Sequence, residues 1–160
     1  MNKLVVITED KVILRGLPRP VSVNRYVGKR HAGKEKSRHK KEFWYWVCDA
    51  GLKKRNDVQK FLFGNNLENF QKKEELSSIK VSYYWGRNLI TKKNTLRVID
   101  ASNHIKATED SIAQWLNIDD CYFHESGISM FHCAGLESFH AIIHMPKPLN
   151  TDACQSLNLS

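Results

Sequence analysis

The sequence predicts a single α+β domain in which two main helices pack on a mixed or antiparallel sheet. The chain has 160 residues, about the length of one domain, and 41% of them are hydrophobic and 26% charged, as in ordinary globular proteins. Segments with alternating apolar residues are interleaved with segments of helical spacing, in the order strands, helix, strands, helix, strands. We therefore expect one domain over residues 1–149, followed by a polar tail, 150–160.

The N-terminal region predicts a β-hairpin. Leu4–Thr8 and Val12–Leu17 are rich in β-branched and aliphatic residues and are separated by a short polar turn. Pro18 and Pro20 end the strand pairing because proline has no amide hydrogen, so we expect Val21–Tyr26 to be extended. No small-residue cleavage site follows the opening residues, and no apolar run reaches about 18 residues, so we expect neither a signal peptide nor a membrane span.

A basic segment precedes the first main helix. Residues 28–41 hold seven Lys or Arg residues and one Glu, and because two glycines loosen the backbone we expect a mobile basic loop. Apolar residues then recur at helical spacing from Ser37 to Leu62, and Gly51 is expected to split this helix. Residues 64–78 lack a clear period, so we expect a loop with a short helix that is an insertion.

The second half of the chain predicts four strands and one helix. Apolar residues alternate over Ile79–Trp85, and Thr95–Ile99 follows a turn-rich segment as a second strand. Between Ser102 and Leu116 the apolar positions keep helical spacing. Ile128–Cys133 and Phe139–Met145 predict two antiparallel strands around a short turn that contains glycine.

The charge of the chain indicates a polyanionic partner. Lys and Arg total 25 against 17 acidic residues, which gives a formal net charge of +8. The four cysteines are Cys48, Cys121, Cys133 and Cys154. Because they show no repeated short spacing, we expect reduced thiols in a cytoplasmic protein. A zinc site built from Cys121, His124, His132 and Cys133 is a weaker alternative, since structural zinc sites usually have two well-spaced ligand pairs.

The segment that begins at Asp100 holds the residue types needed for phosphodiester chemistry. Asn103, Lys106 and Asp110 lie three and four residues apart and share one helical face, and the pair Asp119–Asp120 follows the helix. Carboxylates bind Mg²⁺, which can activate a water, and a lysine can stabilise charge that develops on phosphorus. The spacing alone favours a structural interpretation instead, with a helix cap at Asp100, a surface ion pair and a polar turn.

The helix limits how these carboxylates can meet. A helix from Ser102 to about Ala113 carries the chain roughly 17 Å from Asp100. The seven steps from Ala113 to Asp120 recover at most about 23 to 25 Å. A site that joins Asp100 to Asp120 of one chain therefore requires the helix to stop early and the chain to double back. Otherwise the two aspartates meet across a dimer interface.

Two motifs resemble those of the RusA-type Holliday-junction resolvases of phages and prophages. Asp100–Lys106 is similar to the family's run Asp-x-(Asp or Ser)-Asn-x-x-Lys, which an Asp-Asp pair such as Asp119–Asp120 follows. Pro20–Tyr26 resembles the family's segment Pro-x-Ser-x-Asn-Arg-Tyr, which lies upstream of a basic loop. The resemblance extends from Val12 to Met145, and these two motifs are its specific part.

The resemblance implies a RusA-like fold and a magnesium-dependent endonuclease, with Mn²⁺ as an alternative metal. Such an enzyme acts as a homodimer in the bacterial cytoplasm and resolves four-way DNA junctions by paired symmetric nicks. Asp100, Lys106 and Asp120 match catalytic residues, and Asp100, Asp119 and Asp120 would bind the metal. The supporting residues are Ser102, Asn103, Glu109 and Asp110. The DNA-binding residues are Asn24, Arg25, Lys29, Arg30, Lys34, Lys36, Arg38 and Lys40.

One residue departs from the family pattern. Ser102 stands where the best-known members have aspartate, and a neutral hydroxyl is a far weaker magnesium ligand than a carboxylate. Either Glu109 or Asp119 can supply the missing charge. Ser102 also favours a rival hypothesis, a non-catalytic nucleic-acid-binding protein on the same scaffold.

Overall fold

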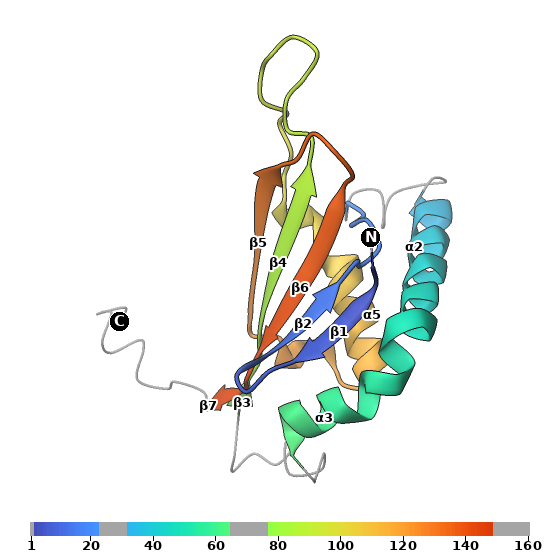
Figure 1. The fold of residues 1–160 in the computed structure, drawn as a ribbon, viewed down its shortest axis with the longest axis vertical. Helices are drawn as coiled ribbons and strands as arrows, with labels where there is room; N and C mark the ends of the chain where they lie inside the picture. Colours follow the sequence, from blue (N-terminus) through green and yellow to red (C-terminus); the bar gives the residue numbers. More distant parts are fainter. Residues whose placement is uncertain (1, 23–31, 65–76, 149–160) are drawn as a thin grey trace, which may run out of the picture.

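The protein is built on a five-stranded mixed sheet. The structure, a computed structural model, describes residues 2–22, 32–64 and 77–148. The strands are β1 (Leu4–Ile7), β2 (Lys11–Arg15), β4 (Lys80–Arg87), β5 (Glu125–His132) and β6 (Ser138–His144). Their order is β1-β2-β6-β4-β5, and β4 and β5 run parallel while the other neighbours are antiparallel (Figure 1). The predicted α+β class and mixed sheet are confirmed.

Short elements complete this framework. A second, two-stranded sheet pairs β3 (Ser77–Ser78) with β7 (Lys147–Pro148). No helix in the described parts of the chain is long and apolar enough to span a bilayer. The residues around Asn24 and Arg25, most of the expected insertion, and the polar tail lie outside the described residues.

The N-terminal hairpin forms as predicted. β1 and β2 pair antiparallel, with Val5 opposite Leu14, and both side chains are buried. The amide of Leu17 then donates to the Phe139 carbonyl at 2.9 Å, which ties the end of the hairpin to β6. β2 in turn pairs with β6, so a strand from the first part of the sequence lies beside the last strand of this sheet.

The predicted pairing of the last two strands is wrong. β4 lies between β5 and β6, so that Tyr83 pairs with Ala141 on one side and with Ile128 on the other. The buried residues Val81, Tyr83 and Trp85 give β4 a largely apolar inner face, which suits the interior of the sheet, whereas most of β5 is exposed. The turn after β5 therefore crosses over the end of β4.

The predicted strand Thr95–Ile99 is also wrong. Residues 88–98 form a projecting hairpin-like loop, here called the finger, with one isolated bridge between Ile90 and Leu96 (Figure 1). A strand needs a partner and a face to bury, but β5 occupies the neighbouring edge of β4, and Val98 is fully exposed.

The first main helix begins earlier than expected. α2 spans Ala32–Trp46, continues through a π-helical segment Val47–Gly51 and a 3₁₀ turn Leu52–Lys54, and leads into α3 (Arg55–Phe63). The predicted break at Gly51 is confirmed. The expected basic loop is wrong from Ala32 onward, because this part of the basic segment is helical.

The second main helix is confirmed. A 3₁₀ turn at Ser102–His104 precedes α5, which spans Lys106–Leu116 and so ends where the apolar spacing predicted, three residues beyond the Ala113 end used to estimate the reach of the chain. α5 lies behind the sheet and α2 runs along its β1 side (Figure 1).

The core lies between these helices and one face of the sheet. Trp46 of α2 meets Trp115 of α5 edge to face, with ring centroids 5.4 Å apart, and Tyr83 stacks on Phe139 at 5.7 Å. A Cβ at Gly51 would approach the Trp115 ring to 2.9 Å, so this contact needs a glycine there. The apolar packing fixes α5 against the sheet.

Candidate active site

Asp100 follows the finger and is held by neutral donors. Its carboxylate accepts hydrogen bonds from the Ser102 hydroxyl at 2.7 Å and from the Asn103 side-chain amide. The Ser102 hydroxyl is the main cause that keeps the pKa of Asp100 below its usual value. The carboxylate is exposed and braces the turn before α5 through side-chain donors, whereas the N-cap positions of the 3₁₀ turn and of α5 are Ala101 and Ile105 rather than Asp100.

An arginine-lined pocket adjoins Asp100. The pocket has a volume of about 500 Å³, and Arg19, Arg38 and Arg87 line it together with Asp100 and Asn103. We call it the arginine pocket. The three arginines, from separate parts of the chain, outnumber the two carboxylates of the lining, Glu35 and Asp100, so the pocket favours an anionic group.

Trp85 orients two cationic or titratable groups of the arginine pocket. The Arg87 guanidinium lies 4.6 Å from the centre of the Trp85 ring, and the His104 ring lies 5.0 Å from it. Both residues also line the pocket. Trp85 itself is fully buried and donates its indole hydrogen to Glu137 at 2.7 Å.

The three arginines differ in their partners. Arg19 contacts Glu137 at 3.4 Å, and Arg38 contacts Glu35 at 2.8 Å. Arg87 has no ion pair within the described part of the chain, and its buried Nε has no hydrogen-bond partner there. Arg87 could therefore bind an anion in the pocket without first breaking an ion pair. Sequence reasoning did not identify Arg87 as a site residue. Its position at the end of an alternating strand, two residues after Trp85, is the feature of the sequence that could have indicated it.

A second cluster, the Lys106 cluster, forms on the first turns of α5. The Lys106 ammonium contacts Asp110 at 2.9 Å and also binds Asp120. The bond to Asp120 is the main cause that raises the pKa of Lys106, and the same bond lowers the pKa of Asp120. Asp119 and Asp110 also interact with the Asp120 carboxyl. The cluster thus holds two of the predicted carboxylates on one cation, and a third, Asp119, interacts with Asp120.

A reversal after α5 brings Asp120 to Lys106. Asn117 adopts a left-handed conformation with φ 56°, and its amide donates to the carbonyls of Ala113 and Gln114. Asp119 then accepts a hydrogen bond from the Cys121 amide at 3.0 Å. The chain doubles back without an early helix end, and within one chain Asp120 reaches Lys106. No hydrogen bond or ion pair joins Asp100 to Asp120 in the described ranges.

Glu109 connects the Lys106 cluster to the sheet. Its carboxylate accepts a hydrogen bond from the Ser126 hydroxyl on β5, and burial raises its pKa. The buried Tyr83 hydroxyl has no partner among the described residues, and burial raises its pKa, with Glu109 and Asp110 adding to the shift. Sequence reasoning missed Ser126 and Tyr83, because their approach depends on the parallel pairing of β5 with β4.

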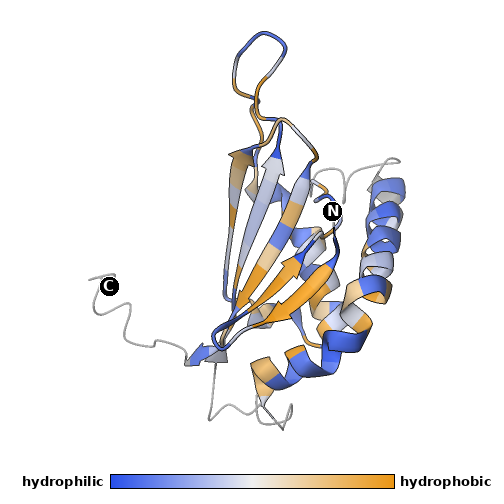
Figure 2. Cartoon of the chain, in the orientation of Figure 1, coloured by the Kyte–Doolittle hydropathy of each residue, from blue (hydrophilic) through white to orange (hydrophobic). Residues whose placement is uncertain are grey.

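The basic residues predicted to bind DNA divide into two groups. Lys34, Lys36, Arg38 and Lys40 lie on α2, and of these Lys34, Arg38 and Lys40 are exposed. Figure 2 shows that the first turns of α2 are strongly hydrophilic. The remaining predicted residues, Asn24, Arg25, Lys29 and Arg30, lie outside the described residues.

The donors present suit magnesium better than zinc. Among the described residues, no group of three or more His, Cys, Asp or Glu side chains is arranged to hold a metal ion. Asp110 and Asp120 nevertheless already share one cation, the Lys106 ammonium, and carboxylate oxygens are the ligands that magnesium prefers. In the zinc alternative, His132 accepts from the Leu89 amide and Cys133 contacts the Leu136 carbonyl, so both have backbone partners.

Comparison of the chain with protein-family models and with curated proteins found no match. The resemblance to the RusA-type resolvases therefore rests on the two motifs alone.

Proposed function

We propose that the protein is a magnesium-dependent endonuclease that resolves four-way DNA junctions as a homodimer, in the manner of the RusA-type resolvases. The observation that carries this proposal is the Lys106 cluster, in which Lys106 and Asp120 meet although 14 positions separate them in the chain. The motif aspartate Asp100 stands at the arginine pocket, three to six residues before Asn103 and Lys106. Carboxylates, a lysine and an anion-binding pocket together suit cleavage of a phosphodiester.

Each group has a role in this chemistry. Asp120, with Asp119 or Asp110, would supply oxygen ligands for Mg²⁺, and Asp100 would add a further one. The metal, when bound, supplies an activated water and neutralises charge on the phosphate. Lys106 would stabilise the additional negative charge of the transition state once its carboxylate partners turn to the metal.

The basic surfaces would hold the substrate. Arg87 would bind a phosphate of the strand to be cut, because its guanidinium lies over the Trp85 ring and forms no ion pair within the described ranges. The exposed cations of α2 would contact phosphates farther along the DNA. A four-way junction has two-fold symmetry, so a two-fold homodimer would present one site to each of two opposed strands. Such a protein would act in the cytoplasm of a bacterium that carries a phage or prophage.

One observation favours a second candidate, a non-catalytic nucleic-acid-binding protein. Ser102 provides a hydroxyl where a carboxylate would bind metal, and this hydroxyl donates a hydrogen bond to Asp100. In this candidate the Lys106 ammonium stays paired with Asp110 and Asp120, and the basic surfaces alone bind DNA.

One experiment separates the two candidates. Purified protein is incubated with labelled four-way junction, linear duplex and single-stranded DNA, with and without Mg²⁺ or Mn²⁺. The proposal expects nicks in opposed strands of the junction only when metal is present. Binding to the junction without nicks at any metal concentration would establish the second candidate instead.

A further inference from the structure

The finger is held in one shape by its own backbone. The Thr91 amide donates to the Thr95 carbonyl at 2.8 Å, and the two hydroxyls lie 2.7 Å apart. Asn94 makes the turn in a left-handed conformation with φ 62°, and its amide donates to the Thr91 carbonyl at 3.0 Å. Nearer the sheet, the Arg97 amide donates to the Leu89 carbonyl at 2.8 Å. These bonds give the finger a defined form although it holds no strand.

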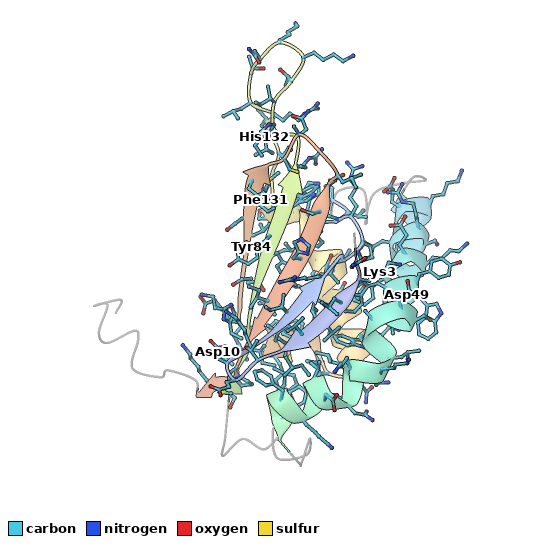
Figure 3. The ribbon with its side chains drawn as sticks, viewed as in Figure 1. Lys3, Asp10, Asp49, Tyr84, Phe131 and His132 are labelled. Atoms are coloured by element: carbon cyan, nitrogen blue, oxygen red, sulfur yellow. The ribbon has the colours of Figure 1, made fainter. Side chains whose placement is uncertain are left out.

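The root of the finger is fixed to the sheet. The Leu89 amide donates to the His132 ring at 3.2 Å, and the Cys133 amide donates to the Arg87 carbonyl at 2.9 Å. His132 stands at the end of β5, directly beside the root of the finger (Figure 3). The finger therefore extends from the end of the β4–β5 pair as a continuation of the sheet.

The surface of the finger combines exposed apolar side chains with positive charge. Its exposed large apolar residues are Ile90, Leu96 and Val98, and its cations are Lys92, Lys93 and Arg97. No acidic residue occurs from Asn88 to Ile99. Leu96 is 76% exposed and Val98 is fully exposed, and Figure 2 shows hydrophilic and hydrophobic segments together in this loop. An ordered loop that holds aliphatic side chains in water between cations has the chemistry of a surface that binds a ligand with both phosphates and apolar faces.

The finger is also connected directly to the candidate active site. The residue before it, Arg87, lines the arginine pocket, and so do Val98 and Ile99 at its other end and Asp100 immediately beyond. A nucleic-acid strand bound by the finger could therefore reach the arginine pocket directly, because the two surfaces are adjacent.

We propose that the finger binds branched DNA at the branch point, where base stacking is interrupted. Lys92, Lys93 and Arg97 contact phosphates around the branch, and Leu96 and Val98 pack against the faces of unstacked bases. Apolar side chains used as wedges act on stacks in this way, and continuous duplex offers them no exposed base face. This inference rests on the proposed function in one respect, which is that the ligand of the finger is DNA.

The test measures binding without cleavage, in buffer that contains EDTA. A four-way junction with 2-aminopurine beside the branch point is titrated with wild-type protein, with the double variant Leu96→Ser/Val98→Ser, and with Leu136→Ser. Leu136 is 79% exposed on the turn before β6 and is the matched control. We expect wild type and the control to raise the fluorescence, because the base is unstacked. The double variant should abolish the rise and reduce the preference for junction over duplex roughly tenfold.

The cations are tested separately. Lys92→Gln/Lys93→Gln should lower the magnitude of the slope of log affinity against log salt by about 1.8 on junction and duplex DNA, because each phosphate contact releases counterions. The matched control is the adjacent pair Lys53→Gln/Lys54→Gln in the 3₁₀ turn after α2, which should leave the slope unchanged.

The outcomes distinguish this inference from the proposed function. Finger variants that bind like wild type, with the same fluorescence rise and salt slope, would overturn the inference even if the protein cuts junctions. A change in the sedimentation of the double variant without DNA would assign the apolar residues to self-association and overturn it as well. Junction-dependent unstacking that requires Leu96 and Val98, in a protein that makes no nicks, would support the inference while the proposed cleavage fails.

Discussion

The two faces of α5 differ in role: one packs in the core and the other carries charged residues of the candidate site. The buried face carries Ile112 and Trp115, which pack in the core, and Thr108, which lies 3.5 Å from the His39 ring of α2. The opposite face carries Lys106 and Asp110 in an exposed charge cluster. The packed face fixes the helix, so the charged groups can be positioned without stabilising the fold themselves. From this difference we expect substitutions on the charged face to change function, and substitutions on the buried face to change stability.

The largest expected effect comes from the charged face. Asp120→Asn removes a carboxylate that would bind metal, so junction cleavage should fall at least about 1000-fold, or about 4 kcal/mol in activation free energy. Junction affinity should stay the same or rise, since negative charge near the phosphates is lost. The free energy of unfolding should change by less than about 1 kcal/mol because the ion pair is exposed.

Nicking assays and thermal unfolding measure these two quantities. Asp49→Asn is the control, because Asp49 is also exposed and paired with a lysine, at 2.8 Å, but lies outside the site. Unchanged cleavage by Asp120→Asn would remove Asp120 from the site. A large loss of stability would show that the two faces are not separable.

The buried face should behave in the opposite way. Trp115→Ala removes the ring that packs on Trp46 and closes over Gly51, so the free energy of unfolding should fall by about 3 to 5 kcal/mol. Chemical denaturation measures this change, with Gln114→Ala on the exposed neighbouring position as control. At low temperature the folded fraction of the variant should keep its DNA affinity. A stability change below about 1 kcal/mol would contradict the packing described for α5.

A smaller effect concerns the pH dependence of stability and involves His39 of α2, which packs against Thr108 on the buried face of α5. Burial lowers the pKa of His39 from 6.5 to about 4. Between these values the unfolded chain binds a proton that the folded protein does not, so stability should fall by about 3 kcal/mol as the pH drops from 6.5 to 4. Asp100 and Asp120, whose pKa values lie below 3.8, lose their contribution only at more acidic pH.

Denaturation series at several pH values test this dependence. His39→Gln removes the titrating ring, and its stability should vary much less over the same window. Equal pH dependence in the variant and in wild type would place the proton uptake elsewhere.

The smallest expected effect concerns Ser102. If the site is active, Ser102→Asp should change the nicking rate only a few-fold and shift the magnesium concentration required, because other carboxylates already hold the metal. If the wild type is inert, the same substitution should restore measurable nicking, since a carboxylate returns beside Asp100. A magnesium titration of both proteins distinguishes the two cases, and Ser111→Asp, farther along α5, serves as control.

The alternating and helical patterns predicted most elements, but not how the sheet is arranged. Val81, Tyr83 and Trp85 marked β4 correctly because a half-buried strand repeats every two residues. The same rule predicted a strand at Thr95–Ile99, where no sheet edge was free to accept one. The parallel pairing of β4 with β5 depends on competition between strands distant in sequence, which local patterns do not encode.

The candidate site was predicted in the same uneven way. Spacing on a helix correctly put Lys106 beside Asp110, since the positions differ by four. Its meeting with Asp120 depends on the reversal at Asn117, and the helical spacing up to Leu116 did not indicate in which direction the chain would continue. Arg19 lies in the segment after β2 and Arg87 at the end of β4, so only the folded sheet brings them to one pocket.

The reversal at Asn117 also has a consequence for the order in which the protein folds. Lys106 and Asp120 are 14 positions apart, whereas the bond that fastens the hairpin to β6, from the Gly16 amide to His140, joins residues 124 positions apart. Closing a short loop costs less entropy and is faster than closing a long one, so the segment from α5 to Asp120 should acquire its contacts before the sheet closes. Pulse-labelling hydrogen exchange during refolding should then find amide protection in α5 ahead of protection in β2 and β6.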